Sequence, residues 1–63
     1  MTPAQEREVF FEFTRLGGSV KVAAIDGDTG IEVAVVGPAT AAPSDLERLA
    51  VAKLKARLAR ESQ

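Results

Sequence analysis

The chain has 63 residues, no cysteine, no histidine and a formal net charge of −1. Disulfides and zinc sites built from thiolate or imidazole ligands are therefore excluded. A chain this short buries only about 60% of its unfolded surface, and domains of this size commonly depend on disulfides, metals or oligomerisation. We therefore predict one domain over residues 1–63 that forms a homodimer.

No cationic start leads into an apolar run, and no apolar stretch approaches the roughly 20 residues that span a membrane. We expect a cytoplasmic protein with no membrane contact. Residues 1–43 carry three basic against six acidic side chains, and residues 44–63 carry five against three. The net charge gives no overall attraction to nucleic acid, although the last third of the chain is mildly basic.

Three strands are predicted at residues 8–16, 19–26 and 31–36, because these segments are rich in β-branched and aromatic residues and turn residues separate them. Gly17 and Gly18 are expected to supply both positive-φ positions of a tight hairpin turn. Residues 27–30 form the second turn. Residues 37–43 contain two prolines and are predicted as a loop.

The two turns fix the strand register. A two-residue first loop pairs Leu16 with Ser19, and a four-residue second loop pairs Asp26 with Ile31. Both hairpins then place their apolar side chains on the same face, although a shift of one residue in either would destroy this agreement. That face holds Val9, Phe11, Phe13, Val20, Val22, Ala24, Ile31, Val33 and Val35.

A helix is predicted over residues 44–60. Ser44 and Glu47 have the spacing of a capping box, and Leu46, Ala50, Leu54 and Leu58 recur at the i, i+4 spacing of one helix face. Lys53 falls within the apolar sector, where its methylenes would lie on the sheet and its ammonium would reach water. Leu49 and Val51 flank the ridge, so the helix is either a loosely patterned surface helix or one whose second flank contacts another subunit.

The predicted fold is an α+β domain, a three-stranded antiparallel β-meander followed by one C-terminal helix packed on one sheet face (βββα). The sheet comprises residues 8–36, the loop 37–43 and the helix 44–60. Phe11 and Phe13 are expected to lie under the helix and to face Leu54.

The opposite sheet face is not cleanly polar. Its apolar side chains are either ordinary exposed residues or a contact patch for a second copy or another protein. The candidate interface, including the outer helix flank, is Phe10, Ala23, Ile25, Ala34, Val36 and Leu49. The first and third strands are also free edges, and edge pairing across a two-fold axis would extend the sheet.

The sequence contains few residues that could catalyse a reaction or bind a metal. Without cysteine or histidine, the candidate nucleophiles are hydroxyls, yet Ser44 suits a helix cap and Thr29 suits a turn. A Ser–Lys or Thr–Lys pair stays open, although nothing in the spacing suggests one. Asp26, Asp28 and Gly30 resemble the start of a calcium loop, but the required glycine and terminal glutamate are missing at the later positions. We therefore predict no catalytic residue, no metal, no cofactor and no enzymatic activity.

A cluster of basic residues lies in the second half of the predicted helix. Cations there are favoured by the helix dipole, or they could contact phosphates in a nucleic-acid accessory module. The chain has no Tyr or Trp on which bases could stack, so nucleic acid is the less favoured alternative. The candidate phosphate contacts are Lys53, Lys55, Arg57 and Arg60.

The stretches EVFFEFTRLGGSVKVAAIDGDTGIEVAVVGPA and SDLERLAVAKL resemble a family of short uncharacterised bacterial proteins. The shared pattern is V-K-V-x-A-I-D, a T-G turn, V-x-G-P-A and L-E-R-L-A, over about residues 8–58. Some members carry the name serine hydroxymethyltransferase. That reaction needs pyridoxal phosphate on a lysine within a much larger fold, so the enzyme name does not suit this chain. The resemblance implies a domain of unknown function and assigns no site residues.

Overall fold

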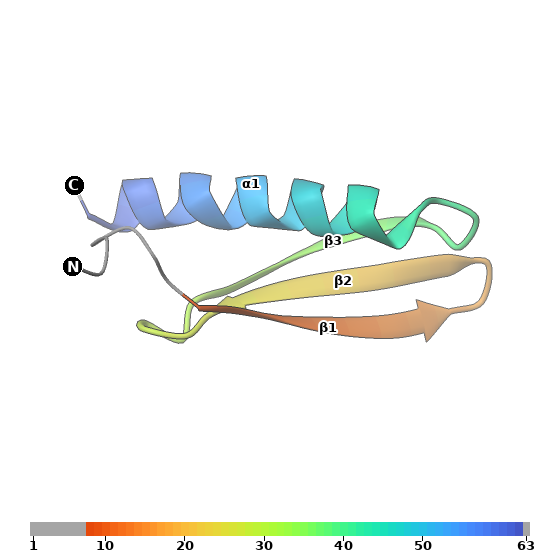
Figure 1. The fold of residues 1–63 in the computed structure, drawn as a ribbon, viewed down its shortest axis with the longest axis horizontal. Coiled ribbons are helices and arrows are strands. Elements are labelled where there is room, and N and C mark those ends of the chain that lie inside the picture. Colours follow the sequence, from red (N-terminus) through yellow and green to blue (C-terminus); the bar gives the residue numbers. More distant parts are fainter. Residues whose placement is uncertain (1–7, 63) are drawn as a thin grey trace.

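The computed structural model describes residues 8–62 as a three-stranded sheet with one helix on one of its faces (Figure 1). Strands β1 (Val9–Leu16), β2 (Ser19–Asp26) and β3 (Glu32–Pro38) are antiparallel and lie in the order β1-β2-β3. Helix α1 (Pro43–Glu61) follows them and runs along the sheet. The predicted α+β meander with one C-terminal helix is confirmed.

The predicted register is also confirmed. Leu16 pairs with Ser19, and the Asp26 amide donates to the Ile31 carbonyl at 2.9 Å. Strand β3 continues two residues further than predicted, to Pro38. A proline is tolerated there because β3 is an edge strand, and the missing N–H faces away from β2.

The first hairpin turn differs from the prediction. Gly17 has a φ of 61°, whereas Gly18 does not have a positive φ. A positive φ at the first central residue alone is the pattern of a type II′ turn, and the predicted pattern was that of type I′. Both turn types match the twist of the flanking strands, so the register is unaffected.

The core lies between α1 and the strands β2 and β3. Its buried side chains come from the helix ridge and from the helix-facing sides of these two strands, namely Val22, Ala24, Val33, Leu46, Ala50 and Leu54. The helix contacts mainly β3 and β2, and β1 is the strand farthest from it in Figure 1.

The expectation that the helix covers Phe11 and Phe13 is therefore wrong. Both side chains share the sheet face with Val22 and Ala24, but they remain 38% and 45% exposed. The reason is geometric. A helix is about 10–12 Å wide with its side chains, while strands are spaced about 4.8 Å apart, so one helix covers two strands and not three.

The start of α1 also differs from the prediction. The N-cap residue is Ala42, which makes no side-chain hydrogen bond, and Ser44 lies inside the helix. The predicted capping box does not form. Pro43 occupies the first helical position, where its fixed φ suits the helix and its missing N–H costs nothing. The chain thus enters the helix two residues earlier than the capping signal at Ser44 indicates.

Gly37 lets the helix approach the sheet closely. A Cβ at this position would lie 2.6 Å from Cδ2 of Leu46, and Leu46 is buried in the core. We expect Gly37→Ala to lower the free energy of unfolding by about 1–3 kcal/mol, because the buried leucine must shift to make room. Urea denaturation followed by circular dichroism measures this change.

Gly18→Ala is the matched control, since the space that an added Cβ would occupy there has no neighbouring atom within 4 Å and the φ of Gly18 is not positive. We expect this control to change stability by less than about 0.5 kcal/mol. Equal stability of the two variants would contradict the close approach at Gly37.

Candidate functional site

The far face of the sheet, opposite the helix, does not form one continuous apolar patch. Phe10 and Ile25 are direct cross-strand partners. Val36 is 63% exposed but pairs with Lys21 at another part of the face. Ala23, between them, has 0% exposure, so its side chain offers no surface to a partner.

The other two members of the predicted interface are also separated. Ala34 pairs with Ala23 and is half-buried. Leu49 is 59% exposed on the helix, and the helix packs on the opposite face of the sheet. The six predicted interface residues are therefore not brought together in one site.

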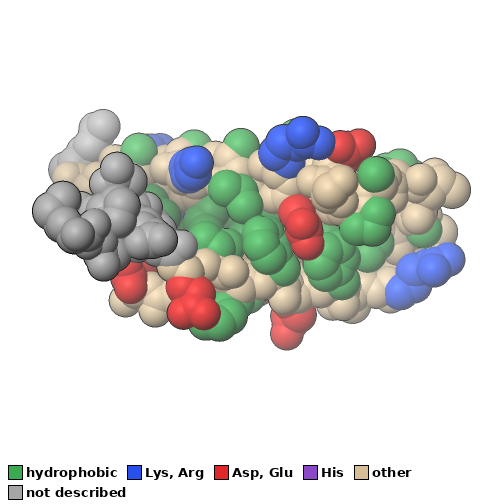
Figure 2. Space-filling view, viewed as in Figure 1, with side chains coloured by type: hydrophobic (Ala, Val, Ile, Leu, Met, Phe, Trp, Pro, Cys, Tyr) green, Lys and Arg blue, Asp and Glu red, His purple; other side chains and the backbone are tan. Residues whose placement is uncertain are grey.

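A different apolar surface lies between β1 and α1. We call it the β1–helix groove and define it by Phe11, Phe13, Val20, Leu46 and Val51. One hollow lies over Phe13, Val20 and Leu46, and a second lies over Phe11 and Val51. Figure 2 shows hydrophobic side chains gathered between the helix and β1.

Charged side chains border this groove. Glu47 and Arg48 line the hollow at Phe11, and Arg15 lines the hollow at Phe13. The Arg15 Nε donates to the Gly17 carbonyl at 2.7 Å, which leaves the other guanidinium N–H groups for further contacts. The groove is thus an aromatic surface with a mixed-charge rim.

Sequence reasoning missed the groove because it placed both phenylalanines in the core. The signal was available in the number of strands. Three strands with large side chains on one face need more cover than one helix supplies. The large side chains of the outer strand that the helix does not cover are then expected to remain exposed.

The edge of β3 is occupied in part by Lys53. Its ammonium donates to the Ala34 carbonyl at 2.8 Å. The lysine is exposed, as predicted, and its ammonium also binds a backbone acceptor on β3 that the sequence did not indicate. Covering an edge with a helix is one means of preventing further strand pairing, and here a helix side chain takes one outward acceptor of β3.

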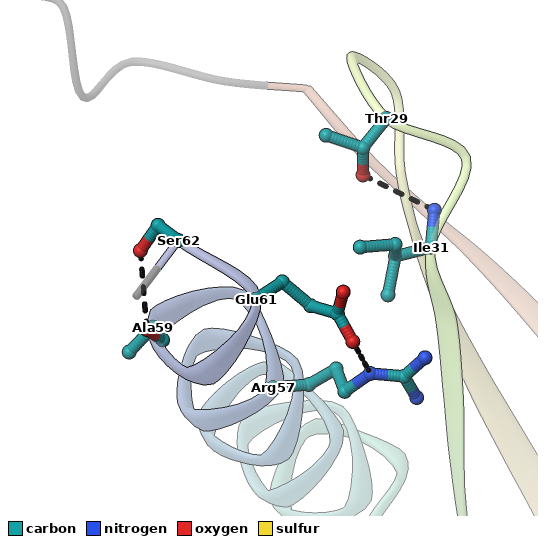
Figure 3. A network of polar contacts seen from close by, with 6 residues as sticks. All are labelled: Thr29, Ile31, Arg57, Ala59, Glu61 and Ser62. Carbon is teal, nitrogen blue, oxygen red and sulfur yellow. Dashed lines mark hydrogen bonds and ion pairs between the residues drawn. The ribbon is translucent and has the colours of Figure 1, made fainter.

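The basic residues of α1 are partly engaged within the chain. Arg57 Nε donates to a Glu61 carboxylate oxygen at 2.9 Å, as Figure 3 shows. Lys53 is held at Ala34, so two of the four candidate phosphate contacts already have partners within the chain. A concentrated phosphate-binding cluster is therefore not formed by the described side chains.

A shallow hollow at the C-terminal end of α1 carries two hydroxyl groups. Thr29 and Ser62 line it together with Glu61. The Ser62 hydroxyl donates to the Ala59 carbonyl at 3.1 Å, and Thr29 Oγ1 accepts from the Ile31 amide at 3.1 Å (Figure 3). Both hydroxyls thus serve local backbone structure.

The aspartates of the second turn also have a structural role. Asp26 is fully buried, and its Oδ2 accepts from the Thr29 amide at 2.9 Å and from the Thr29 hydroxyl at 2.7 Å. Gly30 takes the positive φ of this turn, at 77°. Among residues 8–62, no three acidic side chains gather as a metal site would require.

The family of this chain follows from a comparison with known protein families. A model of a domain of unknown function, DUF6898, matches residues 6–61. The chain belongs to this family. Searches of curated proteins and of solved structures found no match.

The DUF6898 match spans all three strands and the whole helix. The family therefore corresponds to the whole βββα unit, including the β1–helix groove. Within the described part of this DUF6898 chain, no helix is long and apolar enough to cross a membrane.

The Asp26–Thr29 contact gives a stability prediction. Thr29→Val keeps the side-chain shape but removes a donor to the buried carboxylate and an acceptor for the Ile31 amide. We expect the free energy of unfolding to fall by about 1–3 kcal/mol. Thr14→Val, at an exposed position of β1, should change it by less than about 0.5 kcal/mol. Similar denaturation midpoints for the two variants would show that the turn does not depend on this hydroxyl.

Proposed function

We propose that this chain is a non-enzymatic protein that acts by binding protein surfaces, in the first place a second copy of itself. The observation that carries the proposal is the exposure of Phe11 and Phe13 on the sheet face that the helix packs against. Aromatic residues are enriched at protein interfaces, and an exposed apolar surface with a charged rim is typical of such sites.

The size of the chain supports self-association. Its core consists of a few side chains between one helix and two strands, and a chain of this length has a marginal core. A second copy that covers Phe11 and Phe13 would remove further apolar surface from water, which stabilises by about 25 cal/mol per Å². Binding and folding stability would then be linked.

The non-enzymatic part of the proposal is supported by the local engagement of the hydroxyls. Thr29 binds Asp26 and the Ile31 amide, and Ser62 binds a helix carbonyl. A hydroxyl nucleophile is activated by an adjacent base; the chain has no histidine, and the partners described for these two hydroxyls include no lysine. A cytoplasmic location remains a prediction, which fractionation of cells can test.

Sedimentation of the full chain tests self-association. We expect the mass to rise toward that of a dimer between about 5 and 500 μM, a range that corresponds to modest binding free energy. A monomer across this range would contradict the proposal.

Two glutamate substitutions test which surface carries the association. Phe13→Glu places a charge in the β1–helix groove and should weaken self-association at least about tenfold. Val36→Glu places the same charge on the far face and should change it less than about threefold. Circular dichroism checks that both variants are folded. If Val36→Glu is the disruptive change, the far face is the contact and the groove is not.

Nucleic-acid binding is the alternative function, and the geometry favours it less. Lys53 and Arg57 are held by Ala34 and Glu61, so the basic half of the helix presents fewer cations to phosphates than its sequence suggests. A salt-dependent shift with DNA or RNA that is lost in the Lys55→Ala, Arg57→Ala, Arg60→Ala triple variant would support it. Absence of binding at low salt would exclude it.

A further inference from the structure

We infer that the second copy binds at the free edge of β1, so that the two β1 strands pair antiparallel across a two-fold axis. The two sheets then form one continuous sheet with both helices on the same face. This inference rests on the proposed self-association and specifies its geometry. It brings together the open edge of β1 and the β1–helix groove beside it (Figures 1 and 2).

The two edges of the sheet differ in their readiness to pair. On β3, Lys53 donates to the Ala34 carbonyl, and Pro38 has no N–H to donate. Strand β1 has neither lysine nor proline, and its sequence VFFEFTRL is rich in residues that favour strands. Protected and unprotected edges are distinguished by these features, so within residues 8–62 β1 is the edge left open.

The register shows which backbone groups of β1 face outward. The Gly27 amide donates to the Glu8 carbonyl at 2.8 Å, which makes residue 8 and every second residue after it partners of β2. Because bonding direction alternates along an antiparallel strand, the backbone groups of Val9, Phe11, Phe13 and Arg15 point away from β2. Side chains of these same residues lie on the helix side.

A two-fold axis perpendicular to the sheet sets one residue of β1 opposite its own copy. A centre at Glu12 places two carboxylates directly opposite each other, which is destabilising. A centre at Phe11 places the apolar Phe10 opposite the charged Glu12. A centre at Thr14 sets Glu12 against Leu16 and moves Phe11 beyond the partner strand.

A two-fold axis centred at Phe13 gives favourable cross-strand pairs on both faces of the sheet. Phe13 then lies opposite its copy, and Phe11 lies opposite Arg15 on the helix side, in both directions. On the far face Phe10 lies opposite Leu16, and both side chains are half exposed in the single chain. Cross-strand pairs of aromatic and apolar side chains stabilise a sheet, and a guanidinium over an aromatic ring is attractive.

Charge complementarity in the groove supports the same register. Glu47 lines the hollow at Phe11 together with Arg48, whose guanidinium donates to the Asp45 carboxylate. An Arg15 from the second copy, placed opposite Phe11, therefore arrives between an aromatic ring and a carboxylate. The two-fold axis repeats this contact. The rings of Phe11 and Phe13 from both copies fill the space over the central strands that neither helix covers.

A cysteine scan tests the register directly, because the chain has no native cysteine. Residues 11, 12, 13 and 14 are each replaced singly by cysteine, with Val36→Cys as an exposed control on the other edge strand. Directly opposed Cα atoms in a hydrogen-bonded pair are about 5.5 Å apart, which lies within disulfide range. We expect Phe13→Cys to cross-link at least about tenfold faster than the others in a glutathione buffer, measured on non-reducing gels.

Amide hydrogen exchange of the unmodified protein gives a second measurement that needs no variant. Raising the concentration through the dimerisation range should slow exchange of the Phe11, Phe13 and Arg15 amides at least about tenfold. The outward amides of Glu32 and Val36 on β3 should not change. Protection on β3 with none on β1 would overturn the inference.

The outcomes separate the inference from the proposed function. A dimer whose fastest cross-link is not at residue 13, or is matched by Val36→Cys, overturns the β1 pairing but leaves self-association standing. A monomer at every concentration overturns both. A monomer that takes up the strand of a different protein at β1 overturns the second copy as the occupant.

Discussion

The structure depends on the packing of one helix face on two strands. Leu46, Ala50 and Leu54 lie against Val22, Ala24 and Val33, and small side chains at Ala24 and Ala50 keep the layers close. Gly37 extends this close approach to the first turn of the helix, where Leu46 occupies the space a Cβ would need. Because a helix covers about two strands, this packing fixes which strand is left uncovered.

The same packing makes the two sheet edges unequal. A helix centred over β2 and β3 brings Lys53 within reach of the Ala34 carbonyl at the outer edge of β3. It leaves Phe11 and Phe13 on β1 half exposed, with open backbone groups beside them. The position of the helix thus protects the edge of β3 and leaves the side chains of β1 uncovered.

Predictions from the sequence were correct for the features that short local segments determine. They were wrong where a neighbouring residue or the packing of the helix on the sheet determines the structure. Two turns of fixed length determined the register, so the predicted pairing of Leu16 with Ser19 and of the residues beyond them was correct. The capping signal at Ser44 was overridden because Pro43 already suits the first helical position. The helix position over the sheet depends on which strands it covers, and periodicity does not encode that. Phe11 was therefore placed in the core, and Ala23 was placed in an interface although neighbouring side chains cover it completely.

The chemistry of β1 also limits how copies can assemble. An exposed strand rich in aromatic residues favours open stacking of many chains, but in-register parallel stacking would place every Glu12 beside another Glu12, as would an antiparallel pair centred there. An antiparallel pair centred at Phe13 avoids direct opposition of these carboxylates and uses the open edge of both copies. The outer edges that remain are those of β3, where Lys53 already binds the backbone. The proposed pairing through β1 would therefore be self-limiting and would give a closed dimer instead of a fibre.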